Sequence, residues 1–439
     1  MNQLLKLDQT VQLDNGTSCT VKAFLGAGGQ GEVYLADLSG TAVALKWYFA
    51  QQATLEQRAA LQHLLKVGAP NTHFLFPLAL ASSTQNTGFG YVMPLRPANY
   101  ANIADLIKRR VELSFRQLLT ATVELTDSFF KLHSKGLCYR DISFGNFFID
   151  PNTGAILICD NDNVTINGTK TTGVSGTPRF MAPEIVRAQT NPNSDSDLFS
   201  LAVLLFYLLF LHHPLEGKRE AAIKCFDLSA MNQLYGLQPL FIFDPNDNSN
   251  YPVRGYQDNA LIYWAIYPQF IKDLFIQSFT KGLHDVHSRV RGSEWRQQLL
   301  RLKDNIVDCA CGAENFYDKD HLQSTGQLPP CWSCQKHLGL PPRIRIKHPS
   351  QEMTVVLNGG TELYPYHLYP ARKNELSPAV AKVVQHPHKP DVWGLKNLSP
   401  NAWKFTENGA IKTVAQGQSV SLTTGITLDF GQTHAEIRV

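Results

Sequence analysis

The sequence predicts an α+β protein in which a β-rich lobe is followed by a mainly helical lobe and then by two small modules. Three observations support this order. Residues 17–49 alternate between apolar and polar side chains as β-strands do, residues from about 102 onward carry long helical patterns, and short alternating runs return after residue 343. A chain of 439 residues is also too long for one ordinary core, which favours two to three domains.

The composition is that of a globular, water-soluble chain, with 44% apolar and 18% charged residues. The net charge of +3 is too small to indicate a nucleic-acid partner. The first residues lack the basic region and apolar run of a secretory signal, so none is expected. The most apolar stretch, Leu198 to Leu211, has 14 residues, fewer than the about 20 that a bilayer requires. We therefore expect a buried helix there and no membrane span.

A glycine-rich turn lies between the first two predicted strands. Gly26, Gly28 and Gly31 have the spacing Gly-x-Gly-x-x-Gly, which alone fits a hairpin turn, a dinucleotide-binding turn or a phosphate-binding loop. A dinucleotide-binding turn would open a helix, but residues 32–36 continue as a strand. Lys46, at the end of the following strand, adds a charge that can neutralise phosphate. Together these features favour backbone amides that close over nucleotide phosphates.

The next predicted element is a helix over Thr54–Val67, with Thr54 as its N-cap. Glu56 lies in its first turn and is the only acidic residue between Lys46 and Asp105. We therefore expect Glu56 to pair with Lys46 and to hold it over the nucleotide. The alternative is a solvated glutamate on the surface of the helix.

The residues predicted to carry the chemistry lie further along, in the segment 139–162. Asp141 is followed five positions later by Asn146, and Asp160 comes after a strand-like apolar run. Phosphoryl transfer from a metal-bound nucleotide needs one carboxylate for the incoming hydroxyl, together with an amide oxygen and a second carboxylate for Mg²⁺. This trio therefore predicts a phosphotransferase site.

In this order of landmarks, residues 15–302 resemble the eukaryotic-like Ser/Thr protein kinase family as it occurs in bacteria. The landmarks include Val-Ala-Leu-Lys ending at Lys46 and Met-Ala-Pro-Glu ending at Glu184. The resemblance implies a bilobal fold, ATP-dependent Ser/Thr protein kinase activity, and ATP and Mg²⁺ as cofactors. The implied catalytic residues are Lys46, Glu56, Asp141, Asn146 and Asp160. The implied nucleotide-binding residues are Gly26, Gly28, Gly31, Val33, Ala44, Lys46, Met93 and Leu95, and the implied magnesium ligands are Asn146 and Asp160.

The same resemblance implies two contacts and one regulatory segment. Glu184 would pair with Arg289, and Asp197 would anchor the loop that carries Asp141. Arg140 directly precedes Asp141, and in the family this arrangement is associated with control by phosphorylation of the segment that follows. A phosphate offers three acceptor oxygens to a nearby guanidinium. The candidate hydroxyls are those of Thr171, Thr172, Ser175 and Thr177, and a plain solvated loop is the alternative.

The chain departs from the family pattern at the predicted site. Tyr139 stands where the family usually has histidine, and Asn161-Asp162 stands where Phe-Gly usually follows the metal-binding aspartate. In the family the histidine and the phenylalanine at these positions pack against each other. We hypothesise that Tyr139 and Asn161 replace this apolar contact with a hydrogen bond. Ser143 stands where a lysine is usual, and loss of that charge is expected to slow transfer rather than abolish nucleotide binding.

Two other functions stay open. The departures also fit a pseudokinase scaffold that binds nucleotide without transfer, although retention of Lys46 and of the predicted trio favours an active enzyme. The pattern Asp-x-Ser-x-Gly-Asn is similar to small-molecule phosphotransferases of the aminoglycoside-kinase type. Those enzymes lack the Gly-Thr-Pro and Ala-Pro-Glu landmarks that this chain carries at residues 176–184.

Four of the eight cysteines cluster in two pairs, Cys309 with Cys311 and Cys331 with Cys334. Two thiolate pairs on two turns suit a tetrahedral Zn²⁺ with every position filled, and the segment has too few apolar residues to fold without such a staple. We predict a structural zinc ribbon, with two redox-active pairs as the alternative. The remaining cysteines are scattered singly, so we expect a reducing, cytoplasmic location.

Beyond residue 339, short alternating runs predict a small β-sandwich that serves protein interaction. Residues 393–399 and 417–422 resemble the later strands of forkhead-associated domains, without that family's phosphothreonine-reading Arg and Ser. The expected domains are a kinase domain over 1–302, with lobes at about 10–95 and 96–302, a zinc ribbon over 303–338 and the sandwich over 339–439. Similarity to bacterial kinases of this composition implies, besides a protein substrate, a metal-dependent protein phosphatase and a von Willebrand-type domain protein as partners.

Overall fold

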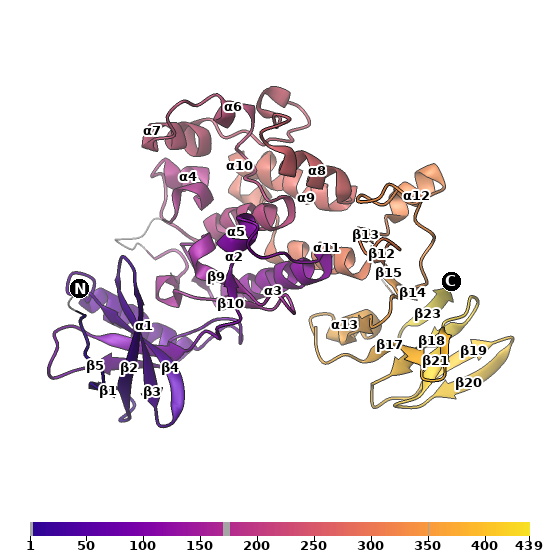
Figure 1. Cartoon of the computed structure of the whole chain (residues 1–439), viewed down its shortest axis with the longest axis horizontal. Helices are drawn as coiled ribbons and strands as arrows, with labels where there is room; N and C mark the ends of the chain where they lie inside the picture. The colour runs from indigo at the N-terminus through magenta and orange to yellow at the C-terminus, as the bar shows by residue number, and fades with distance from the viewer. Residues whose placement is uncertain (1–2, 170–175, 350) are drawn as a thin grey trace. The chain divides into compact units, whose positions relative to one another are not determined.

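The structure is a computed structural model that describes residues 3–169, 176–349 and 351–439 (Figure 1). The chain divides into two units. The first comprises Met1–Ala265 and Gln269–Arg296, and the second comprises Ile266–Pro268 and Gln297–Val439. The division falls inside a helix, α11 (Gly292–Asp304), so this helix contributes residues to both units.

Strands at the start of the first unit close into an antiparallel barrel. Their order around the barrel is β1 (Thr10–Leu13), β2 (Ser18–Ala27), β3 (Gly31–Leu38), β4 (Thr41–Tyr48), β6 (Gly90–Pro94) and β5 (Ala79–Ser82). Val21, Tyr34 and Leu45 are among the buried side chains that fill it, as the alternating pattern predicted. Helix α1 (Leu55–Val67) follows β4, and the Thr54 hydroxyl caps it by accepting from the Gln57 N–H.

The rest of the first unit is mainly helical and is organised around α5 (Ser194–Phe210). Nearly every side chain of α5 is buried, because the helix lies in the core of the unit and packs against α3 (Phe115–Ser134). Asn193 caps its N-terminus. The predicted buried helix is therefore confirmed. Within the part of the chain that the structure describes, no helix combines the length and the apolar character needed to cross a bilayer.

Short elements complete this unit. The strands are β7 (Ala101–Asn102), β8 (Leu137–Cys138), β9 (Phe147–Ile149), β10 (Ile156–Ile158) and β11 (Thr165–Ile166). The further α-helices are α2 (Ile103–Ile107), α4 (Pro183–Val186), α6 (Lys218–Ala221), α7 (Leu228–Met231), α8 (Asp258–Ile266), α9 (Gln269–Phe279) and α10 (Lys281–His284). Strands β9 and β10 form the hairpin that separates the loop after β8 from the segment after β10.

The second unit begins with the hairpin β12 (Ile306–Asp308) and β13 (Glu314–Phe316), followed by α12 (Lys319–Thr325). Two antiparallel sheets follow. The first has the order β15 (Glu352–Val356), β14 (Arg343–Lys347), β23 (His434–Arg438), β22 (Thr427–Asp429), β19 (Trp403–Glu407) and β20 (Ala410–Val414). The second has the order β16 (Glu362–Leu363), β17 (Ala381–His386), β18 (Lys389–Asn397) and β21 (Ser419–Ser421), with α13 (Pro365–Leu368) between β16 and β17. Side chains of both sheets, among them Ile344 and Leu395, meet in one buried cluster.

Candidate active site

The glycine-rich turn joins β2 to β3 in a hairpin, in which the Gly28 N–H donates to the Gly31 carbonyl at 2.9 Å. Packing requires a glycine at Gly31, because a Cβ there would lie 2.2 Å from the Trp47 carbonyl oxygen. At Gly26, Gly28 and Gly29 an added Cβ would meet no atom of the described chain within 4 Å. Internal packing therefore explains one of these glycines, and the backbone at the other three is open to the close approach of a ligand.

The apolar residues predicted to bind the nucleotide come together. Ala44 and Met93 face each other in the register of β4 and β6, and both are buried. Val33 and Leu95 are partly buried against the same cluster. This apolar surface adjoins the glycine-rich hairpin through Val33 on β3, and its chemistry suits a flat aromatic base.

Lys46 lies under the hairpin with only 6% of its side chain exposed. Its Nζ contacts Asp162 Oδ2 at 2.8 Å and Asp160 Oδ1 at 3.6 Å. Gln30, at the tip of the glycine-rich turn, accepts from Nζ at 2.8 Å and donates to Asn163 Oδ1 at 3.2 Å. Burial by itself would lower the pKa of Lys46, but the two carboxylates outweigh burial and hold this pKa above its ordinary value.

The predicted pair of Lys46 with Glu56 is wrong. Glu56 lies on the exposed side of α1, and the ion pairs that Lys46 forms among the described residues are the two just given. The neighbouring Gln57 faces inward, and its Nε2 donates to the Tyr48 hydroxyl at 3.1 Å and to the Asp162 carbonyl oxygen at 3.4 Å. One position along an α-helix turns a side chain by about 100°, so the phase of α1 decides which residue faces the site.

The predicted trio is joined through the backbone. Asn146 Nδ2 donates to the Asp141 carbonyl oxygen at 2.9 Å, and the Asn146 carbonyl accepts from the Cys159 N–H at 2.8 Å. Asp160 follows with a left-handed backbone, at φ 47°. Burial raises the pKa of Asp160, the charge of Lys46 opposes this rise, and nearby carboxylates including Asp141 add to it. The charged groups of the trio and Lys46 therefore act on one another.

Thr177 contacts the predicted catalytic aspartate. Its Oγ1 donates to Asp141 Oδ1 at 2.9 Å, which orients the carboxylate. Phosphorylation of Thr177 stays a prediction. The other candidate hydroxyls, those of Thr171, Thr172 and Ser175, lie outside the described residues.

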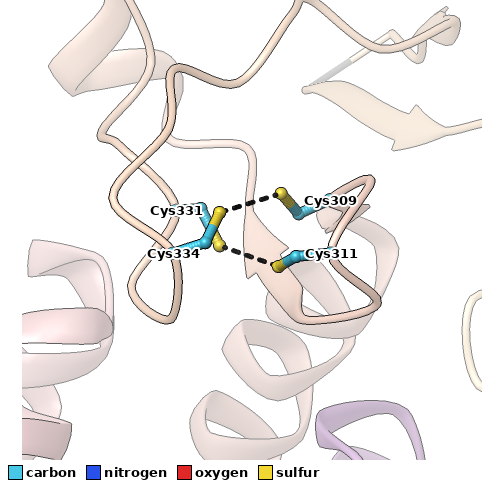
Figure 2. A group of neighbouring side chains, drawn as sticks. All are labelled: Cys309, Cys311, Cys331 and Cys334. Atoms are coloured by element: carbon cyan, nitrogen blue, oxygen red, sulfur yellow. Dashed lines mark hydrogen bonds between the residues drawn. The ribbon is translucent and has the colours of Figure 1, made fainter.

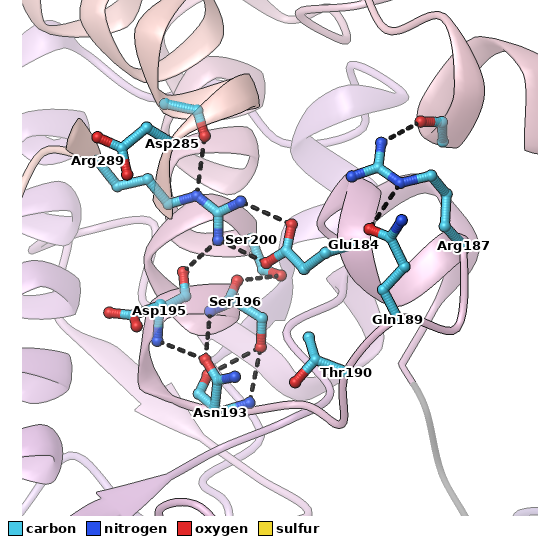
Figure 3. Close-up of polar contacts among 12 residues, drawn as sticks. Glu184, Arg187, Gln189, Thr190, Asn193, Asp195, Ser196, Ser200, Asp285 and Arg289 are labelled. Atoms are coloured by element: carbon cyan, nitrogen blue, oxygen red, sulfur yellow. Dashed lines mark hydrogen bonds and ion pairs between the residues drawn. The ribbon is translucent and has the colours of Figure 1, made fainter. Parts of the chain in front are cut away.

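Two buried contacts hold the loop that carries Asp141 and the segment that ends at Glu184. Asp197, at the start of α5, accepts from the backbone N–H groups of Tyr139 at 2.6 Å and Arg140 at 3.0 Å. Glu184 forms a two-pronged ion pair with Arg289, in which both N···O distances are 2.8 Å (Figure 3). Both predicted contacts are confirmed.

The two unusual residues beside the trio do not bond to each other as hypothesised. The Tyr139 hydroxyl donates to the Cys159 carbonyl, while Asn161 Nδ2 donates to the Ile158 carbonyl at 2.9 Å. The Tyr139 ring packs edge-on against Phe129, so it keeps an apolar contact as well. Each side chain thus bonds to a backbone carbonyl one or two positions before Asp160.

In the second unit the four clustered cysteines converge. All their Sγ atoms lie within 4.8 Å of one another, with Cys309–Cys334 and Cys311–Cys331 at 3.7 Å (Figure 2). A tetrahedral Zn²⁺ with Zn–S bonds of about 2.3 Å requires sulfur–sulfur separations of about 3.8 Å. Asn315 Nδ2 donates to Cys331 Sγ at 3.5 Å, as partners of metal-bound thiolates do. The donor set and its spacing therefore fit zinc.

Sequence reasoning missed three residues of the site, namely Tyr48, Gln57 and Asp162. Tyr48 is two positions after Lys46 on β4, so both point to the same face, and this spacing was a readable signal. Asp162 was recognised only as a departure from the family pattern. Its contact with Lys46 joins positions 116 residues apart, which no local pattern reports.

Comparison with known proteins agrees with this geometry. The protein kinase domain family matches residues 19–286, well over half of the 439 residues. Similar proteins include a probable serine/threonine-protein kinase of Zea mays, 30% identical over 118 residues (26% of this chain and 19% of the relative). Protein kinase C of Drosophila melanogaster is 30% identical over 211 residues (45% and 27%). The serine/threonine-protein kinase PknK of Mycobacterium bovis is 31% identical over 130 residues (29% and 11%).

The match therefore spans no more than 27% of the length of these three relatives. Each of the three relatives is named as a protein kinase, and two of the names specify a serine/threonine-protein kinase. With the family match over residues 19–286, the conclusion is that this chain belongs to the protein kinase family.

Proposed function

We propose that the protein is a Ser/Thr protein kinase that transfers the γ-phosphate of ATP to a protein hydroxyl. The observation that carries the proposal is the joining of Lys46, Asp160, Asn146 and Asp141 by the contacts described above, beside a glycine hairpin with open space over its backbone. Positioning and charge stabilisation are the main demands of phosphoryl transfer, and these are the groups it needs.

Each residue has a defined task in this proposal. Lys46 holds the phosphates by charge. Asn146 and Asp160 offer an amide and a carboxylate oxygen to Mg²⁺, which prefers oxygen ligands and neutralises phosphate charge when bound. The Asn146 nitrogen is engaged with the Asp141 carbonyl, so its oxygen is the atom left to coordinate. Asp141, oriented by Thr177, accepts the proton of the substrate hydroxyl.

We also propose that the second unit holds a structural zinc ribbon, over about residues 303–338, and a forkhead-associated-like sandwich over 339–439. The sulfur spacing supports the first assignment, and the two facing sheets with a common core support the second. These modules would select or hold the protein substrate. A metal-dependent phosphatase and a von Willebrand-type protein are the proposed partners, and the cytoplasm is the proposed location.

The test is transfer of labelled phosphate from ATP to the protein itself and to casein, with Mg²⁺ present. Wild type should label both, whereas Asp141→Asn and Asp160→Asn should fall by two or more orders of magnitude, about the scale for loss of a catalytic group. Glu112→Gln, at an exposed glutamate of the first unit, is the control for loss of a carboxylate charge and should behave as wild type. Equal labelling by all four proteins would contradict the proposal.

A nucleotide-binding scaffold is the second candidate. Ser143 in place of the usual lysine, and a helix glutamate turned away from Lys46, favour it. The same experiment separates the two functions, because a scaffold binds ATP with no transfer that depends on Asp141.

A further inference from the structure

A buried carboxylate lies at the centre of the predicted phosphate site. The Asp162 side chain is completely buried, and its Oδ2 accepts from Lys46 Nζ at 2.8 Å and from the Tyr48 hydroxyl at 2.6 Å. Lys46 and Tyr48 project from the same face of β4. An ion pair withdrawn from water in this way is strongly coupled and breaks only at a large cost.

The surroundings of Asp162 place a positive charge and two hydrogen-bond donors beside a carboxylate that is withdrawn from water. Lys46 and Tyr48 are themselves buried, at 4% and 1% exposure. Tyr91 faces Lys46 in the register of β4 and β6 and is fully buried. Asp160 contacts Lys46 as well, but at 3.6 Å and with 47% of its side chain exposed.

Helix α1 contacts Tyr48 and Asp162 through the neutral side-chain amide of Gln57. Gln57 donates to the Tyr48 hydroxyl and to the Asp162 backbone carbonyl, whereas Glu56 is exposed. In protein kinases the strand lysine is ordinarily paired with a glutamate of this helix, and the pair must be formed for activity. The family's residue at position 162 is glycine, which has no side chain to offer. The two departures are therefore complementary: a carboxylate is lost from the inward face of the helix and gained at position 162.

We propose that Asp162 is the positioning residue that holds Lys46 for the nucleotide phosphates, in place of the helix glutamate. The proposal rests on the proposed function, because it assigns Lys46 to phosphate binding. One consequence is regulatory. Since the anion belongs to the segment after Asp160, a displacement of α1 leaves Lys46 paired, and only a displacement of that segment releases it.

The test compares three variants with wild type. Asp162→Asn keeps the shape and removes the charge. Glu56→Gln tests the ordinary pairing. The double variant Gln57→Glu with Asp162→Gly returns the carboxylate to the helix, and it remains testable if Asp162→Asn fails to fold. Glu112→Gln, at an exposed glutamate of the first unit, is the control for charge.

Two readouts are needed. The first is kcat and KM for ATP, with folding checked by circular dichroism. The second is the dissociation constant of a non-hydrolysable ATP analogue, measured by isothermal titration calorimetry. The second does not depend on phosphate transfer, so an inactive wild type would overturn the proposed function and still test the pair.

We expect Asp162→Asn to lower kcat/KM by about 100-fold, the scale for a misplaced catalytic group. The dissociation constant of the analogue should rise by about tenfold, because a misplaced lysine no longer meets the phosphates. Glu56→Gln should change neither readout. The double variant should recover part of the lost kcat/KM and return the dissociation constant towards that of wild type. An unchanged dissociation constant in Asp162→Asn, or a loss in Glu56→Gln as large as that in Asp162→Asn, would overturn the proposal.

Discussion

Arg289 and Glu184, 105 residues apart, meet in an ion pair whose side chains are only 2% and 12% exposed. The same guanidinium donates to the carbonyls of Asp195 and Gly282, so it joins the end of the segment after the active site to the start of α5 and to α10. The position of the segment that ends at Glu184 therefore depends on Arg289, which is not one of the residues predicted to carry the chemistry.

Replacement of this arginine should destabilise the first unit. Arg289→Ala leaves the Glu184 carboxylate nearly buried without its partner, which costs roughly 3–5 kcal/mol of unfolding free energy. Urea unfolding followed by tryptophan fluorescence measures the change. The comparison variant is Arg372→Ala, which breaks an exposed pair with Glu375 and should change stability little. Similar midpoints for the two variants would contradict the structural role.

The Thr177 hydroxyl should matter for turnover more than for ATP binding. Thr177→Val removes the hydrogen bond to Asp141 Oδ1, so the carboxylate loses an orienting donor, and kcat should fall about tenfold or more while KM for ATP stays the same. Thr177→Ser keeps the donor and serves as the matched variant. Steady-state kinetics on both decide the matter, and equal kcat values in the two variants would exclude the orienting role.

Acid should destabilise the first unit through His213. This ring is 1% exposed, donates from Nε2 to the Arg179 carbonyl at 2.8 Å and accepts from the Leu215 N–H at 3.0 Å. Burial lowers the pKa of His213 to about 4, against the opposing charge of Glu216. Between pH 6.5 and about 4, His213 is therefore protonated in the unfolded chain and neutral in the folded chain. The free energy of unfolding consequently falls as the pH falls. The loss is about 3 kcal/mol over this range.

The variant His213→Gln retains hydrogen-bonding groups and cannot titrate. Its unfolding free energy should vary less between pH 4 and 7 than that of wild type, whereas His284→Gln, at an exposed histidine, should keep the wild-type slope. Urea unfolding at several pH values is the measurement. A slope for His213→Gln that equals the wild-type slope would show that another group causes the acid sensitivity.

Zinc should be present at one equivalent per chain and should stabilise the start of the second unit. Cys311→Ser removes one ligand and should abolish stoichiometric zinc, while Asn315→Ala, which removes the donor to Cys331, should weaken binding by about 10- to 100-fold. Cys225→Ser, at an exposed cysteine of the first unit, is the control. Metal analysis and competition with a chelator test this. A zinc content far below one equivalent in wild type would rule out the ribbon.

Much of the fold could be predicted because its signals are local. The alternation in β3 and β4, the Thr54 cap of α1 and the apolar run of α5 each concern residues close together in the chain. Four cysteines in two short pairs likewise indicate one metal site.

The order of Lys46, Asp141, Asn146 and Asp160 along the chain was enough to predict a phosphotransferase site, because this chemistry requires those groups and a family resemblance ties them to a fold. The order of residues along the chain did not predict which carboxylate pairs with Lys46. That choice depends on the rotation of α1, where one position separates exposed Glu56 from inward Gln57, and on the folding of the segment after Asp160 back against β4. The rotation of α1 and the path of this segment are determined by packing between residues distant in sequence. A buried charge then pairs with the opposite charge that this packing places beside it.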